Sequence, residues 1–142
     1  MKKMTVLILL GIVVLGISAV AVANVGVKLR VNIPFAFYAD KALMPAGEYI
    51  FDIGSAGFGA ATSSAVLIHN ESGDVVRWLL TVPGTAMSES DSHLHFNRYG
   101  SKYFLTKIEG AGYQANTKTT AAEKELRAQN QTPTDTRVAA GK

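Results

Sequence analysis

Apolar residues occupy every second position from Val25 to Phe37, and this alternation constrains the fold more than any other feature of the chain. A period of two is typical of a β-strand that buries one face and exposes the other. Pro34 lies within this run and has no N–H to donate, so we expect the strand to bend there or to lie at a sheet edge. The apolar positions are Val25, Val27, Leu29, Val31, Ile33, Phe35 and Phe37.

A second strand is predicted directly after the turn residues Pro45 and Gly47, because Tyr49, Phe51 and Ile53 again alternate with other residues. The short connection favours pairing of this strand with Val25–Phe37 in the same domain. One alternative is that Val25–Phe37 completes the sheet of a second copy, which would give self-association by donated strands.

Two further hairpins follow. Residues 65–69 and 75–82 flank a turn that contains Gly73, and residues 93–97 and 103–108 flank a turn in which Gly100 supplies a positive φ. In the first hairpin, Trp78 shares a face with three other apolar residues, so we expect Trp78 to anchor the core. The other three are Val76, Leu80 and Val82.

These elements predict an all-β domain over residues 24–118, a small antiparallel barrel or sandwich of about six to eight strands. Thr120 and Glu123 have the spacing of a capping box, which predicts one short helix over 119–129. The remaining segment, 130–142, is polar and carries little apolar surface, and we therefore expect a disordered tail.

The N-terminus has the pattern of a signal peptide. Lys2 and Lys3 precede an apolar run from Met4 to Val20, and Ala21–Ala23 provide an A-x-A cleavage site, so residues 1–23 are expected to be removed on export. The mature protein would be periplasmic or extracellular. It would contact a membrane only if this segment is retained as an anchor.

Charge and cysteine content exclude several classes of protein. The net charge of +3 falls further when the two N-terminal lysines are removed, which leaves no basic excess for binding nucleic acid. The chain has no cysteine, which excludes disulfides, a lipoprotein anchor and thiolate metal sites. Stability must come from the core alone.

Several short motifs resemble those of a family of exported proteins, found mainly in soil bacteria, that has no established activity. The motifs are Ile33-Pro34-Phe35 with Phe37, Pro45-Ala46-Gly47-Glu48-Tyr49, and Leu94, Phe96, Arg98-Tyr99-Gly100 with Tyr103-Phe104-Leu105. The likeness extends from about Val31 to Leu126. It implies export and a β fold, and it implies no functional residues.

One polar cluster has the composition of a metal site. His93 and His95 lie two residues apart on a predicted strand and would share a face, with Glu89 or Asp91 as a third ligand. The alternative is a solvated strand face, because an H-x-H pair alone is a weak signal.

No serine lies in a G-x-S-x-G elbow, and no other catalytic arrangement is apparent. We therefore predict a non-enzymatic exported domain, without a cofactor, that has a binding or structural role in the cell envelope toward an unknown partner. The alternatives are a metal-binding protein or metal-assisted enzyme that uses His93 and His95, a carrier whose aromatic residues line an apolar cavity, and the donated-strand assembly described above.

Overall fold

The computed structural model describes residues 26–53, 65–85, 91–110 and 112–141, which form ten strands and one helix. The predicted signal peptide lies outside these ranges, and so does Glu89. No helix within them is long and apolar enough to cross a membrane. The elements are β1 (Val27–Ile33), β2 (Phe37–Ala39), β3 (Ala42–Met44), β4 (Gly47–Ile53), β5 (Ala65–Asn70), β6 (Val75–Pro83), β7 (His93–Tyr99), β8 (Lys102–Gly110), β9 (Tyr113–Thr117), α2 (Ala121–Ala128) and β10 (Thr134–Ala139).

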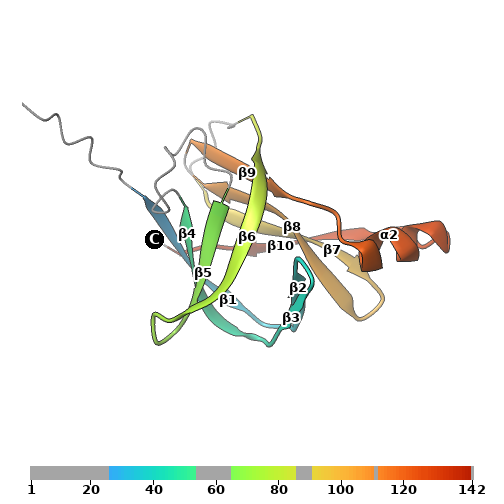
Figure 1. Cartoon of the computed structure of the whole chain (residues 1–142), viewed down its shortest axis with the longest axis horizontal. Helices are drawn as coiled ribbons and strands as arrows, with labels where there is room; N and C mark the ends of the chain where they lie inside the picture. Colours follow the sequence, from blue (N-terminus) through green and yellow to red (C-terminus); the bar gives the residue numbers. More distant parts are fainter. Residues whose placement is uncertain (1–25, 54–64, 86–90, 111, 142) are drawn as a thin grey trace, which may run out of the picture.

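The strands form one curled sheet in the order β1-β4-β5-β6-β9-β8-β2-β3, with β7 and then β10 branching from β8. The pairs are antiparallel, except for a short parallel contact of Tyr38 with Phe104 between β2 and β8. The curl brings the chain after β10 back to β1, where Gly141 donates its N–H to the carbonyl of Arg30 at 2.8 Å. The sheet does not close, and the fold is sandwich-like, as Figure 1 shows. The predicted all-β class with one short helix is confirmed.

The first hairpin is β1 with β4, in a register that runs from Val27 opposite Ile53 to Ile33 opposite Gly47. The pairing within one domain is thus observed. The predicted single strand to Phe37 is broken, because β1 ends directly before Pro34 and β2 begins three residues later. Pro34 therefore marks a bend.

The turns use the residues that the sequence indicates. Gly73 and Gly100 both have positive φ, of 87° and 59°, in the β5–β6 and β7–β8 connections. Pro45 precedes β4, and its carbonyl accepts a hydrogen bond of 2.8 Å from the hydroxyl of Tyr49. The turn between β2 and β3 has no glycine, and Asp40 adopts the left-handed conformation there.

The core between the two sides of the curl is built on aromatic residues. Phe37 contacts both Tyr49 and Phe96 edge-on, with ring centroids 5.5 Å apart in each pair. Phe51 and Phe104 are also fully buried. The aromatic residues that were expected either to fill the interior or to line a cavity thus pack largely on one another, with Trp78 as the exception.

Trp78 does not anchor the core, and this prediction was wrong. Its side chain is 55% exposed, while its neighbour Leu79 is 1% exposed and packs inside. Alternation along β6 favours the opposite face, because the set that contains Trp78 is entirely apolar whereas the set that contains Leu79 includes Arg77 and Thr81. The register decides which face is buried, because β6 pairs Leu79 with the buried Val66 of β5.

The predicted disordered tail was also wrong, because residues 134–139 form β10. This strand pairs with β7 from Thr134 opposite Arg98 to Ala139 opposite His93. Its inward side chains Thr136 and Val138 are half-buried. Few apolar residues are needed here, because the edge of β7 supplies main-chain partners along the whole segment.

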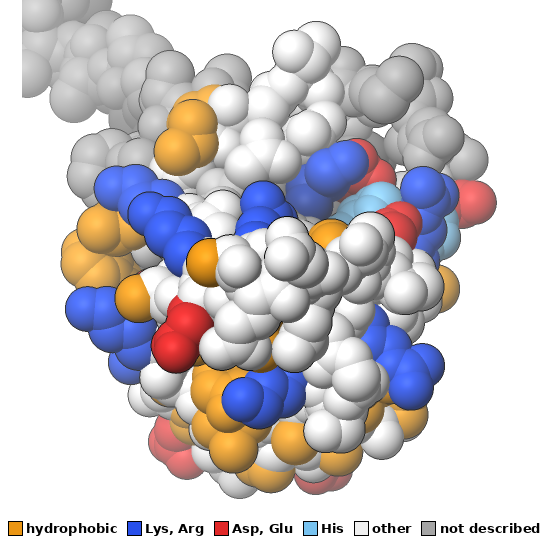
Figure 2. Space-filling model, turned by 90° about the vertical axis from the view of Figure 1, so that its right-hand side faces the viewer, with side chains coloured by type: hydrophobic (Ala, Val, Ile, Leu, Met, Phe, Trp, Pro, Cys, Tyr) orange, Lys and Arg blue, Asp and Glu red, His pale blue; other side chains and the backbone are white. Residues whose placement is uncertain are grey.

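The predicted helix is confirmed as α2, which begins after Thr120. The hydroxyl of Thr120 accepts a hydrogen bond of 3.1 Å from the N–H of Glu123, as expected of an N-cap. Figure 2 views the molecule from the α2 side, and Lys and Arg side chains are spread over this face among apolar and acidic ones.

Candidate functional site

His95, one of the two candidate metal ligands, is buried on β7 between two carboxylates. Its Nε2 lies 2.8 Å from Oε2 of Glu109 on β8, and its Nδ1 lies 3.4 Å from Oδ1 of Asp135 on β10. Each carboxylate also binds a cation, because Lys107 Nζ lies 3.1 Å from Glu109 and Arg137 Nε lies 3.1 Å from Asp135. His95 therefore links three strands by charged hydrogen bonds.

The charges in this cluster favour ionised carboxylates. Burial by itself raises the pKa of Glu109, but hydrogen bonds and positive charge from His95 and Lys107 outweigh it and hold the pKa below its usual value. The pKa of Asp135 is lowered in the same way, since hydrogen bonds to Arg137 and His95 and the positive charge of both outweigh desolvation.

This geometry gives His95 a structural role that competes with metal binding. Both ring nitrogens of His95 already face carboxylates, so a metal ion would have to displace one of them. His93 is half-buried and Asp91 is exposed at the start of the strand. Within the described residues, no group of three or more His, Asp or Glu side chains is arranged to hold a metal ion. The metal site on His93 and His95 stays a prediction.

A second polar cluster surrounds Glu123 of α2. The side chain of Glu123 is buried, because this residue is only 2% exposed. Its Oε1 accepts hydrogen bonds from Asn97 Nδ2 at 2.6 Å, from the Tyr99 hydroxyl at 3.2 Å and from Arg127 Nη2 at 2.9 Å. Arg127 Nε also donates to the Tyr99 hydroxyl at 2.8 Å, and these hydrogen bonds raise the pKa of Arg127. The cluster fastens α2 to β7. Sequence reasoning assigned Glu123 to the cap and missed its burial.

Two acidic residues on the outer face of β4 do not pair with each other. Glu48 binds Arg30 of β1 at 2.8 Å. Asp52 is 5% exposed and lies 3.9 Å from both Lys28 Nζ and His69 Nε2. Each acid thus faces a potential cation on a neighbouring strand.

The most unusual surface is the outer face of β6, where large apolar side chains follow one another at every second position. We call these residues the β6 row: Val76, Trp78, Leu80 and Val82, which are 42%, 55%, 54% and 51% exposed. Across from Trp78, Leu67 of β5 is also apolar and half-buried, so the row continues onto the neighbouring strand.

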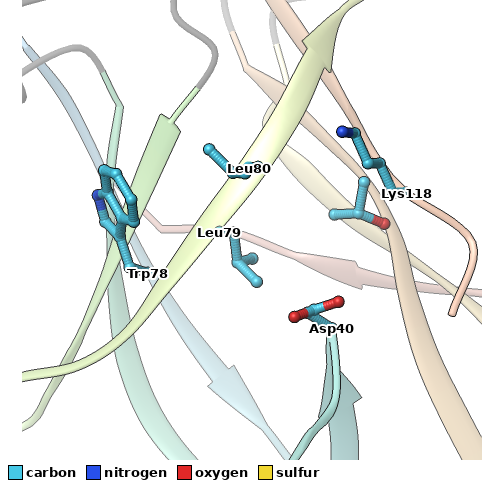
Figure 3. Close-up of a pocket in the computed structure, with 6 residues that line it drawn as sticks. Asp40, Trp78, Leu79, Leu80 and Lys118 are labelled. Atoms are coloured by element: carbon cyan, nitrogen blue, oxygen red, sulfur yellow. The ribbon is translucent and has the colours of Figure 1, made fainter.

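A hollow of about 200 Å³ lies beside this row, at the edge of β6 that faces away from β5. β6 contributes Trp78, Leu79 and Leu80, while Asp40 and Lys118 stand on the far side, as Figure 3 shows. Thr117, at the end of β9, completes the lining. Asp40 also binds Arg77, with Oδ2 and Nη2 3.1 Å apart. The hollow thus has an apolar wall and a polar wall.

Comparison with protein-family models, with curated proteins and with solved structures finds no match for this chain. The resemblance to an exported bacterial family stays a prediction. Any functional assignment must come from the geometry above.

Sequence reasoning named all four members of the β6 row but placed them on the wrong face. The charged residue Arg77 in the middle of the strand favoured this wrong assignment, because a charge predicts that its face of the strand is exposed to solvent. Arg77 nevertheless points to the inner side, where its Nη2 binds Oδ2 of Asp40 at 3.1 Å while its buried Nε has no hydrogen-bond partner among the described residues.

Proposed function

We propose that this chain is an exported, non-enzymatic β-domain that acts by binding another molecule in or outside the cell envelope, and that the β6 row is the surface it uses. The observation that carries the proposal is the row itself, four large apolar side chains that are each about half exposed on one strand face. Single exposed apolar residues are ordinary, but a contiguous row of them marks an interaction surface.

Covering the whole β6 row contributes about 4 kcal/mol, which by itself corresponds to a dissociation constant of about 1 mM, so a partner must add further contacts. Full burial of a large apolar side chain contributes about 1.5–3 kcal/mol, so covering the exposed half of each member contributes about 1 kcal/mol. Trp78 is the natural centre of such an interface, because tryptophan is enriched among the residues that dominate binding energy.

The non-enzymatic part of the proposal is supported by the state of the ionisable groups. His95, Glu109 and Glu123 are each held by partners of opposite charge or by donors. They serve to join β7 to β8, β10 and α2. A general acid or base must be able to reach a proton on the substrate, whereas these groups form hydrogen bonds to other side chains of the fold.

The test is capture of a partner by the immobilised mature protein from the exported protein fraction of the native cells. The test variant carries Trp78→Ser with Leu80→Ser, and the matched control is Leu43→Ser, because Leu43 is 60% exposed but lies outside the row. We expect wild type and the Leu43 variant to retain the same partner and the double variant to lose it. Thermal melts of all three proteins check that the fold is intact.

If the double variant retains the partner as well as wild type does, or if wild type retains nothing, the β6 row is not the binding surface.

A further inference from the structure

We infer that the open edge of β6 binds an extended segment of a partner protein as an added antiparallel strand, in which apolar residues alternate with small polar ones. This inference rests on the proposed function and names the partner of the same surface. Three observations support it: the direction of the main-chain groups of Trp78 and Leu80, the β6 row beside them, and the hollow with its polar wall at the same edge.

The main-chain groups of Trp78 and Leu80 point to a part of the β6 edge with which no described strand pairs. Gly84 donates its N–H to the carbonyl of Gln114 on β9 at 2.9 Å. Because the N–H and C=O groups of a strand point alternately to its two edges, those of Val82, Leu80 and Trp78 point to the same edge as those of Gly84.

β9 covers only the end of that edge. It pairs with β6 from Thr81 to Pro83 and then turns away at Lys118. On the opposite edge, β5 pairs with β6 as far as Leu80. Within the described strands, the main-chain groups of Trp78 and Leu80 that point to this edge thus have no strand to pair with. An added segment would pair with β6 directly beyond the point where β9 ends.

The side chains of such a segment have matching surroundings on both faces. In an antiparallel pair, residues directly opposite each other place their side chains on the same face. Segment residues that exchange hydrogen bonds with Trp78 and Leu80 would therefore lie next to the β6 row and should be apolar. The residues between them would point into the hollow, where Asp40, Thr117 and Lys118 offer hydrogen bonds.

The shape of the site favours an extended peptide over the edge of a second copy. The open edge of β6 is recessed, because Asp40 reaches across to Arg77 and Lys118 borders the hollow on the same side (Figure 3). The β6 edge of a second folded copy is recessed in the same way, so the two edges cannot meet. A terminal or loop segment that is not already paired in a sheet can reach the β6 edge.

The inference is tested with the peptide acetyl-(Thr-Val)₃-amide and two N-methylated versions, using the fluorescence of Trp78, which is the only tryptophan in the chain. One version is methylated on the valine amides and the other on the threonine amides. The geometry places valine amides toward β6 and threonine amides away from it. We expect valine methylation to weaken binding about tenfold or more, because each valine amide that faces β6 loses a hydrogen bond, and threonine methylation to change it little.

A protein variant provides the complementary arm. Leu80→Pro removes the N–H of Leu80, which points to the open edge, while leaving the pairing of Leu79 with β5, and Leu80→Ala keeps that N–H as the matched control. We expect the proline variant to lose peptide binding by about tenfold relative to the alanine variant. Circular dichroism confirms that both variants fold.

Three results would overturn the inference. Equal binding of both methylated peptides would mean that the row binds apolar side chains without strand addition, and the proposed function would stand. Absence of saturable binding up to about 1 mM peptide would exclude strand addition at a useful affinity. The capture experiment would then still test whether the β6 row is a binding surface. Dimerisation that Leu80→Pro abolishes would make a second copy the occupant.

Discussion

Glu123 offers the most direct test of how the helix is held to the sheet. Replacing Glu123 with alanine removes the carboxylate oxygen that accepts hydrogen bonds from Asn97, Tyr99 and Arg127. We expect the free energy of unfolding to fall, because these donors lose a charged acceptor that is almost fully buried.

The magnitude follows from the state of each donor. A hydrogen bond to a charged group contributes about 1.5–3 kcal/mol when both groups are buried. The guanidinium of Arg127 is half exposed and regains water, and Tyr99 keeps its contact with Arg127 Nε, so the full sum does not apply. We expect a total loss of about 2–3 kcal/mol, which lowers the melting temperature by about 10 °C in a domain of this size.

The assay is urea unfolding of a chain of residues 24–142, followed by circular dichroism. The matched control is Glu125→Ala, because Glu125 lies on the same helix, is exposed, and should change stability by less than about 0.5 kcal/mol. Glu123→Gln keeps one acceptor oxygen and should lie between wild type and the alanine variant. If Glu123→Ala and Glu125→Ala unfold alike, the buried carboxylate does not hold α2 and this reasoning is wrong.

Three further predictions concern other parts of the sheet. The lowered pKa values of Glu109 and Asp135 stabilise the fold above the unfolded carboxyl pKa near 4, and this contribution is lost as the pH falls through the folded values. Asp135→Asn should therefore reduce the difference in unfolding free energy between pH 7 and pH 3, by less than about 1 kcal/mol because Asp135 is half exposed. An unchanged difference would contradict a stabilising role of the ion pairs around His95. Gly100→Ala should lower the free energy of unfolding by about 1 kcal/mol because Gly100 has a φ of 59°, although a Cβ there would meet no atom within 4 Å. The control Gly47→Ala, at a residue without positive φ, should lower it by less in the same urea unfolding assay. Equal effects would refute the argument from the backbone conformation. Deleting residues 134–142 should lower the melting temperature and speed amide exchange in β7, because β10 covers that edge, and no change in exchange would mean that β10 contributes little.

The alternation of the N-terminal strand and the turn glycines were sufficient to predict much of the fold from the sequence. Period-two patterns show directly which side chains share a face, and β1 and β4 follow them in register. Gly73 and Gly100 were predictable for a local reason, since positive φ costs glycine nothing. Thr120 likewise caps α2 through contacts within four residues.

Only the tertiary structure decided the contacts between segments that are distant in the sequence. His95 meets Asp135 forty residues away, so no local spacing could have shown that its ring is occupied on both sides. The tail of the chain is too polar to form structure alone, yet the edge of β7 gives it a strand partner.

β6 shows the boundary between the two kinds of information most clearly. The sequence by itself determined that Trp78 belongs to an apolar strand, because valine and leucine residues surround it. It indicated the wrong face as buried, since the set that contains Trp78 is entirely apolar while the set that contains Leu79 includes Arg77 and Thr81. The pairing of β6 with β5 turns Leu79 into the core and leaves Trp78 outside, beside an open strand edge. The candidate binding surface therefore exists because of register, a property that depends on two strands and not on one.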